Sequence, residues 1–277
     1  MNPISITRQE WRRVFVFALI LVGLTMLPYI AGWLAQNEAR TFSGAVIGTE
    51  DFYSYIGKMR LGARGSWDFY LFYTPEPSDA VALVFLPYIL PGQIVGRFIA
   101  PDSPALTPAL VATYHIMRVL FDLLLIGVLY RFIAEFLNSS TQRMTALILA
   151  TLGGGFGWLL TFVNKDWLGS LPPEIFIPEG FSFVLLLSLP HLALARAALL
   201  GGLLLLFRAV EPNQPRWITY ALGASLCWWL VGLVVPFYLA VLYCILGAWG
   251  LALWLRRRAF PWTFALRGGL AAGLTLP

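Results

Sequence analysis

The chain has 277 residues, of which 59% are hydrophobic and only 12% carry a charge, with a formal net charge of +5. This composition excludes an ordinary soluble domain and predicts one membrane-embedded domain over residues 1–277. Most basic residues lie in loops between apolar segments, where they act as topology signals and do not indicate a nucleic-acid partner. Cys227 and Cys244 both fall in apolar segments and indicate neither a disulfide nor a metal site.

Apolar runs of membrane-spanning length recur along the chain. A spanning helix needs about 20 mainly apolar residues. Spans are predicted at residues 14–34, 108–130, 144–163, 181–207, 217–235 and 237–255. The first is too long for the core of a signal peptide, so we expect it to be retained. A last run, 262–277, ends with the chain and is predicted to be a truncated seventh span, which would make the sequence an N-terminal fragment.

The segment 80–100 has the length of a span but contains two prolines, two glycines and an arginine. If it does not cross, the basic residues of the short loops all share the side of the N-terminus, as the positive-inside rule favours. These residues are Arg8, Arg12, Arg13, Arg131, Arg143, Arg208, Arg216, Arg256, Arg257 and Arg258. We therefore expect a multi-pass protein of the cell (plasma) membrane with a cytoplasmic N-terminus, and with residues 35–107 and 164–180 outside.

The first outer loop opens with a polar, acidic stretch, residues 48–55. From Phe52 onward apolar residues recur at helical spacing, which predicts a short amphipathic helix on the membrane surface. In one interpretation Thr49 caps this helix and the acids of its first turn complement the helix dipole. In the other, Asp51 with Glu50 beside it is a general base that takes a proton from an acceptor hydroxyl. Both can hold together. A second interfacial helix is predicted over residues 81–90.

This arrangement resembles the GT-C superfamily, membrane glycosyltransferases that use polyprenyl-phosphate-linked sugars. The short motifs that carry the resemblance are Glu50-Asp51-Phe52-Tyr53-Ser54-Tyr55, Tyr73-Thr74-Pro75-Glu76-Pro77, Tyr114-His115-Ile116-Met117-Arg118 and Pro190-His191. They are similar to the pattern of uncharacterised bacterial members.

The resemblance implies an all-α, GT-C-like transmembrane bundle with interfacial helices in the first outer loop. It also implies an inverting glycosyltransferase whose active site is extracytoplasmic, with Asp51 in the place of the catalytic carboxylate. The implied donor is a polyprenyl-phosphate-linked sugar. The acceptor, whether glycan, lipid or protein, stays open. A divalent metal also stays open, because some members need one and others do not, and the chain shows no convincing metal-ligand spacing.

Four cations are candidate contacts for the donor phosphate: Arg118, Lys58, Arg60 and Arg64. Arg118 lies inside a predicted span, one helical turn from Asp122, so the two side chains could instead neutralise each other. His115 lies one turn above Arg118 on the same face. The three loop cations could equally contact anionic lipid headgroups, although an arginine offers paired donors that suit phosphate.

The remaining site candidates are His191, His115, Tyr55, Glu76 and Glu179. His191 follows Pro190 inside a predicted span, where it either forms a hydrogen bond between helices or contacts the donor or a metal. Acids and aromatics of the second outer loop suit either a sugar ring or an interfacial anchor.

Two further features have structural interpretations. Arg196 is a charge inside the predicted span 181–207, for which Glu135 and Asp122 are candidate partners on other helices. The glycines of residues 153–157 lack the Lys-Ser/Thr that completes a phosphate loop, so they predict close helix packing.

Two rival classes remain at this stage. A transporter or lipid flippase would also carry intramembrane charges, but it predicts an internal repeat with broken helices at matching positions, and no such repeat is visible. The second rival is a non-catalytic membrane assembly factor.

Overall fold

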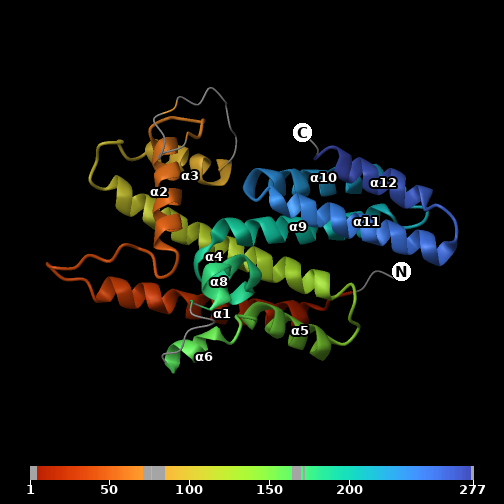
Figure 1. Ribbon diagram of the computed structural model, residues 1–277, viewed down its shortest axis with the longest axis horizontal. Coiled ribbons are helices and arrows are strands. Elements are labelled where there is room, and N and C mark those ends of the chain that lie inside the picture. The colour runs from red at the N-terminus through yellow and green to blue at the C-terminus, as the bar shows by residue number, and fades with distance from the viewer. Residues whose placement is uncertain (1–4, 71–75, 77–84, 164–169, 171, 276–277) are drawn as a thin grey trace.

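The fold is described from a computed structural model for residues 5–70, 76, 85–163, 170 and 172–275. The regular secondary structure of these residues is helical, and an isolated bridge joins Asn37 and Arg40. The helices are α1 (Arg8–Leu34), α2 (Thr49–Ala63), α3 (Leu86–Gly96), α4 (Leu106–Ile133), α5 (Ser140–Leu152), α6 (Gly157–Phe162), α7 (Pro173–Phe176), η1 (Pro178–Gly180), α8 (Ser182–Ser188), α9 (Pro190–Ala209), α10 (Trp217–Val234), α11 (Phe237–Arg257) and α12 (Trp262–Gly273). In Figure 1, α9 to α12 lie together on one side, and α2 and α3 pack near the start of α4.

In the part of the chain that the structure describes, four helices are long and apolar enough to cross a membrane: α1, α9, α10 and α11. Large apolar side chains such as Ile20, Leu226 and Trp254 remain exposed on these helices, as expected of surfaces that face lipid. The chain is therefore a multi-pass membrane protein. The predicted span 108–130 corresponds to α4, a continuous helix of 28 residues.

The predicted span 144–163 is wrong as a single helix. α5 ends at Leu152 and α6 begins at Gly157, and neither reaches the length that a bilayer requires. Gly155 adopts a φ of +75° in the connection, and the Glu174 carboxylate accepts a hydrogen bond from the backbone N–H of Gly157. A Cβ atom on Gly155 or Gly157 would overlap the Glu174 carboxylate, so these glycines allow a close approach to α7 at the connection between α5 and α6.

The predicted span 181–207 is broken at Leu189. Proline has no N–H and disfavours helical geometry in the residue before it, and Leu189 accordingly has φ −120° and ψ 80°. In a continuous helix Ser182 and Arg196 would stand about 21 Å apart along the axis. The Arg196 guanidinium instead donates to Ser182 Oγ at 3.3 Å, so the chain turns sharply between α8 and α9. His191 is consequently the second residue of α9.

The amphipathic helix of the first outer loop is confirmed as α2. Its buried face includes Phe52, Ile56 and Met59, and Glu50 and Asp51 lie in its first turn. The N-cap, however, is Gly48 in the left-handed conformation, with no side-chain capping bond. The prediction that Thr49 caps the helix is therefore wrong.

The next helix, α3, lies later in the chain than the predicted segment 81–90, of which residues 81–84 fall outside the described residues. It has 11 residues, about half the length of a span. This length agrees with the prediction that the segment 80–100 does not cross the membrane.

Glycines allow α2 and α3 to cross with their backbones in contact. A Cβ atom on Gly92 would lie 1.9 Å from the carbonyl oxygen of Met59, and one on Gly62 would lie 2.0 Å from that of Ile89. Small residues have the same use where membrane helices approach closely. The crossing places Tyr88 of α3 against α2.

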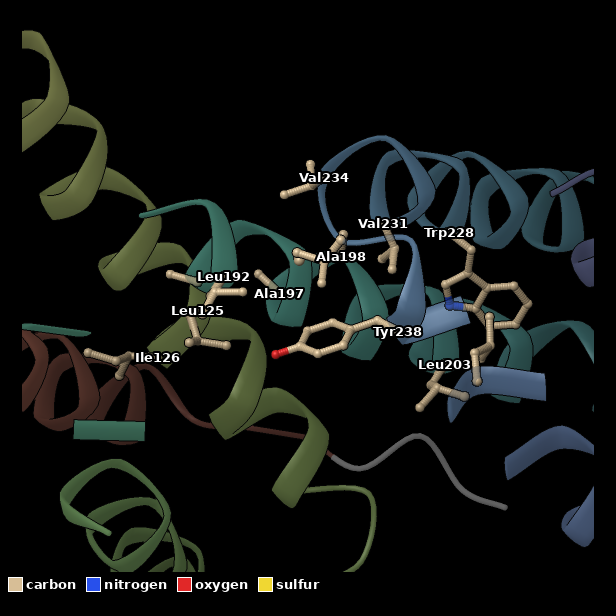
Figure 2. Close-up of a cluster of buried hydrophobic side chains, with 14 of the residues drawn as sticks. Leu125, Ile126, Leu192, Ala197, Ala198, Leu203, Trp228, Val231, Val234 and Tyr238 are labelled. Carbon is tan, nitrogen blue, oxygen red and sulfur yellow. The ribbon is translucent and has the colours of Figure 1, made fainter. Parts of the chain in front are cut away.

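The main apolar core lies between α4, α9, α10 and α11. Figure 2 shows Leu125 of α4, Leu192 of α9 and Tyr238 of α11 among its side chains. Further along α9, the fully buried Trp228 packs directly on Gly202 and donates from Nε1 to the carbonyl of Leu199 at 3.2 Å. This packing joins α10 firmly to α9.

Polar contacts show which helix ends lie together. At one end, Glu10 in the first turn of α1 accepts hydrogen bonds from Tyr130 and Arg143. Glu135 forms ion pairs with Arg131 and Arg208 at the ends of α4 and α9. We call this the basic end. The beginning of α9 instead meets α2 and α3. The basic residues at the beginning of α1, around the connection between α4 and α5 and at the end of α9 therefore lie at one end of the bundle, as predicted.

Candidate functional site

A polar cluster forms where α2, α3 and the beginning of α9 meet. Tyr88 Oη lies 2.7 Å from His191 Nδ1, and Tyr55 Oη lies 3.3 Å from His191 Nε2. The rings of Tyr55 and Tyr88 stack with centroids 4.5 Å apart. A neutral imidazole has one donor and one acceptor nitrogen, so one tyrosine donates to His191 and the other accepts. We call Tyr55, Lys58, Tyr88 and His191 the His191 cluster.

Lys58 contributes a cation to this cluster. Its side chain is 5% exposed, and Nζ donates to Ser54 Oγ at 2.8 Å. The same nitrogen lies 3.9 Å from the centre of the Phe85 ring and 4.7 Å from that of Tyr55, in range of cation–π attraction. Burial lowers the pKa of Lys58, and the nearby Asp51 carboxylate opposes this shift. The cluster thus holds a buried amine beside an acid.

The acids of the first outer loop stay accessible. Glu50 and Asp51 are exposed, and neither forms a hydrogen bond or an ion pair with any residue that the structure describes. Asp51 precedes Tyr55 by one helical turn and Lys58 by two, so the three share a face of α2. Burial raises the pKa of Tyr55, and the Asp51 and Glu179 carboxylates raise it further. An acid from each predicted outer loop therefore lies near the Tyr55 hydroxyl.

Arg118 occupies a different environment. Its side chain is 0% exposed, and the guanidinium donates to Thr25 Oγ1 at 2.9 Å and to the Leu186 carbonyl at 3.1 Å. The predicted Arg118–Asp122 ion pair does not form. Both carboxylate oxygens of Asp122 are buried without a hydrogen-bond partner among the described residues.

The contacts of Arg118 belong to a set that completes the end of α8. Tyr29 donates to the Leu187 carbonyl and Tyr114 to the Ser188 carbonyl, both at 2.7 Å. The last carbonyls of a helix have no partner within it, and Pro190 has no N–H to offer Leu186. Side chains of α1 and α4 supply the missing donors. A donor phosphate could bind Arg118 only by displacing these contacts, and that role remains a prediction.

The other first-loop candidates have separate attachments. His115 is buried, with Nε2 2.9 Å from the Gly44 carbonyl, and so ties the loop before α2 to α4. Arg60 is exposed and donates to Thr107 Oγ1 at 2.9 Å. Arg64 is exposed at the end of α2. Glu76 is also exposed, but its neighbours in sequence lie outside the described residues.

The second predicted outer loop is described only in part. Residues 165–167, which supply Lys165, Asp166 and Trp167, lie outside the described residues. Glu174 is buried and accepts the Gly157 N–H, so its carboxylate has a structural partner. Among the described acids of that loop, Glu179 acts on the His191 cluster, because its carboxylate raises the pKa of Tyr55.

Arg196 pairs with neither predicted partner. It donates to the Glu179 carbonyl, to Ser182 Oγ and, at 3.4 Å, to the Tyr238 hydroxyl. Glu135 instead pairs with Arg131 and Arg208. Sequence reasoning also missed Tyr88, because no local pattern marks a tyrosine whose partner lies 103 residues away.

Fold and site together define the class only broadly, as an all-α, multi-pass membrane protein with a polar cluster at one end. Comparison with family models, curated proteins and solved structures found no match. Within the residues that the structure describes, no group of three or more His, Cys, Asp or Glu side chains gathers to form a candidate metal site.

Proposed function

We propose that this chain is an integral membrane glycosyltransferase of the GT-C type, which transfers a sugar from a polyprenyl-phosphate-linked donor to an acceptor hydroxyl. One observation carries the proposal. At one end of an apolar helical bundle, the accessible Asp51 shares a face of α2 with Tyr55 and Lys58, and both the Asp51 carboxylate and that of Glu179, from the second predicted outer loop, raise the pKa of Tyr55. A membrane-soluble donor and a polar acceptor would meet at such a boundary.

Asp51 is the proposed general base. It takes the proton of the acceptor hydroxyl while that oxygen forms a bond to the anomeric carbon of the sugar. The bond between the anomeric carbon and the phosphate oxygen breaks, and polyprenyl phosphate leaves with the electron pair. Configuration inverts because attack and departure occur on opposite faces. A positioned carboxylate of this kind contributes typically 10²–10⁴-fold to a rate.

The other residues take supporting roles in the proposal. Arg64, which is exposed, is the proposed first-loop contact for the donor phosphate, because Lys58 is buried and donates to Ser54, and Arg60 donates to Thr107. Tyr55 and His191 position α2 and offer hydrogen bonds to the sugar. By the positive-inside rule the basic end is cytoplasmic, which puts the His191 cluster on the extracytoplasmic face.

Donor consumption tests the reaction class. Membranes that contain the full chain are supplied with radiolabelled sugars on polyprenyl monophosphate, and in a parallel sample with the same sugars as nucleotide derivatives. We expect label to leave the polyprenyl carrier and free polyprenyl phosphate to accumulate, with no direct use of nucleotide sugars. Transfer from nucleotide sugars when the polyprenyl carrier is absent would contradict the proposal.

One structural feature favours a transporter as the second candidate. The turn between α8 and α9 and the gap between α5 and α6 are breaks within segments of spanning length, as transporters often contain. Proteoliposomes loaded with a labelled lipid-linked sugar distinguish the two functions. Movement of the intact molecule across the bilayer supports transport, whereas cleavage of the sugar from its phosphate supports transfer.

A further inference from the structure

A cavity of about 350 Å³ lies between α4, α5, α8, α9 and α11, apart from the catalytic base proposed above. Its polar lining residues are Thr151, Glu179, Ser182, Arg196 and Tyr238, and apolar side chains such as Leu129 and Leu200 line the remainder. Val241, which also lines it, is 48% exposed. The cavity therefore reaches the surface of the bundle that would face lipid.

The charge of Arg196 is not neutralised by direct contact with an acid. Its hydrogen-bond acceptors are a backbone carbonyl and two hydroxyl groups, and it forms no ion pair within the residues that the structure describes. A charge in a membrane segment is costly and normally has a partner. Glu179 lines the same cavity and accepts from Arg196 through its backbone carbonyl, but its carboxylate does not approach Arg196 within ion-pairing distance.

The order of residues along α9 matches an amphiphile. Arg196 lies about 9 Å along the helix from Pro190, and Leu199 and Leu200 follow one turn later. The Arg196 side chain reaches Ser182 and the Glu179 carbonyl. A ligand with an anionic head at Arg196 would thus extend an apolar chain along Leu199 and Leu200 between α4 and α9.

We propose that this cavity binds one anionic phospholipid of the surrounding bilayer, with its phosphate on Arg196 and one acyl chain against Leu129, Leu199 and Leu200. Phosphate suits the paired donors of a guanidinium, and the apolar walls suit a hydrocarbon chain. The bound lipid would supply the counter-charge that Arg196 lacks and would fill the space beside α8. This site does not depend on the proposed glycosyl transfer.

Lipid retention tests the site. The purified full chain is stripped of lipid in detergent, mixed with phosphatidylglycerol, phosphatidylcholine or polyprenyl phosphate, and examined by native mass spectrometry. We expect one phosphatidylglycerol per chain to survive washing. Arg196→Gln, which removes the charge, and Leu200→Trp, which fills the chain-binding part but keeps the charge, should each reduce its retention at least tenfold. Glu179→Gln should increase retention, because it removes a negative charge beside the phosphate.

Matched controls separate the site from general lipid coating. Arg97→Gln removes an exposed arginine elsewhere, and Leu226→Trp enlarges an exposed leucine on α10; both should retain the lipid as the wild type does. Equal retention by wild type, Arg196→Gln and Leu200→Trp would overturn the proposal. Retention of polyprenyl phosphate with none of phosphatidylglycerol would overturn it too, because the cavity would then select the carrier lipid over the bilayer lipid.

Discussion

At the residue scale, His191 is the point where three helices are joined by polar contacts. Tyr88 is 1% exposed and lies at 2.7 Å, whereas Tyr55 is half-buried and lies at 3.3 Å. Burial raises the pKa of both hydroxyls, so both remain neutral hydrogen-bonding groups at ordinary pH. The two hydrogen bonds differ in length and in access to water, so we expect their removal to lower the free energy of unfolding by different amounts.

Tyr88→Phe should destabilise the protein more than Tyr55→Phe. Removing the Tyr88 hydroxyl leaves a buried imidazole nitrogen without a partner, which costs about 1–3 kcal/mol. At Tyr55 water can replace the lost hydroxyl, so we expect a cost below about 1 kcal/mol. Thermal unfolding of the two variants in detergent measures the difference. A larger loss for Tyr55→Phe would contradict the assigned geometry.

Lys58→Met should reveal a stability that depends on pH. Burial lowers the pKa of Lys58 from its ordinary value of 10.5. Between the folded and unfolded pKa values the unfolded chain binds more protons, so the stability of the wild type rises with pH there. The loss of stability caused by burying the charged amine is complete below the pKa of Lys58 in the folded state and vanishes above its pKa in the unfolded state. The variant, which has no amine, should be more stable than the wild type at pH 7.

The stability gap between Lys58→Met and the wild type should shrink as the pH rises toward 10.5. Fluorescence-monitored unfolding at a series of pH values measures both proteins under the same conditions. Arg64→Met, which changes an exposed cation on the same helix, is the matched control and should show no such trend. A gap that stays constant with pH would show that Lys58 is not penalised by burial.

The part of the His191 cluster that lies on α2 could be predicted from the sequence. The spacing of Asp51, Tyr55 and Lys58 on one helical face is a local property, and the pattern of apolar residues from Phe52 identified that helix. The partners of Tyr55 on α3 and α9 could not be predicted, because their meeting depends on how the helices cross. The direct Arg118–Asp122 pair was predicted from spacing alone, and it fails because Arg118 finds acceptors on α1 and α8.

At the element scale, the crossing of α2 and α3 depends on glycine. The backbones meet at Gly92 and Gly62, where any Cβ atom would overlap a carbonyl oxygen. In the sequence, Gly92 was visible only as an interruption of the apolar segment 80–100, and Gly62 only as a break after the amphipathic helix. Their role in close packing depends on where the partner helix lies, which the local sequence does not show.

Gly92→Ala should force α2 and α3 apart and destabilise the protein by about 1–3 kcal/mol, the usual range for overpacking. Gly127→Ala is the matched control, because no atom lies within 4 Å of the added Cβ on α4. There the substitution should be neutral or stabilising by roughly 0.5–1 kcal/mol. Equal effects of the two variants on thermal unfolding would contradict the close crossing.

The break between α8 and α9 shows what a hydropathy pattern misses. Residues 181–207 are mainly apolar, so their average hydropathy predicts one span, although Pro190 marks a boundary. A break in a helix leaves backbone carbonyls without hydrogen-bond partners. The break is stable here because Tyr29, Tyr114 and Arg118 donate to three successive carbonyls. These donors are between 68 and 158 residues away in sequence, beyond the reach of local reasoning.

At the scale of the whole molecule, the bundle has a basic end and an end built from α2 and α3. Composition predicts the membrane class, and the distribution of arginines predicts which loops share a side. The contacts of Glu10 and Glu135 bring those loops together as expected. Two predicted spans nevertheless break, since neither composition nor hydropathy records where a helix turns.

Labelling of introduced cysteines tests the orientation. Glu50→Cys on α2 and Arg257→Cys near the end of α11 are both exposed positions, made in a chain whose Cys227 and Cys244 are replaced by alanine. A membrane-impermeant thiol reagent added to intact cells should label position 50 but reach position 257 only after the membrane is permeabilised. Labelling of both positions from the same side would contradict the two-ended arrangement.

The most direct test of the account compares Asp51→Asn with Glu50→Gln in single-turnover transfer from a radiolabelled polyprenyl-phosphate sugar. Both acids are exposed in the first turn of α2, so the two variants change the helix and its charge alike. If Asp51 is the base, Asp51→Asn should slow transfer about 10²-fold or more, while donor binding and Glu50→Gln remain close to the wild type. Equal transfer rates in the two variants would remove Asp51 from the mechanism and leave the acids as complements of the helix dipole.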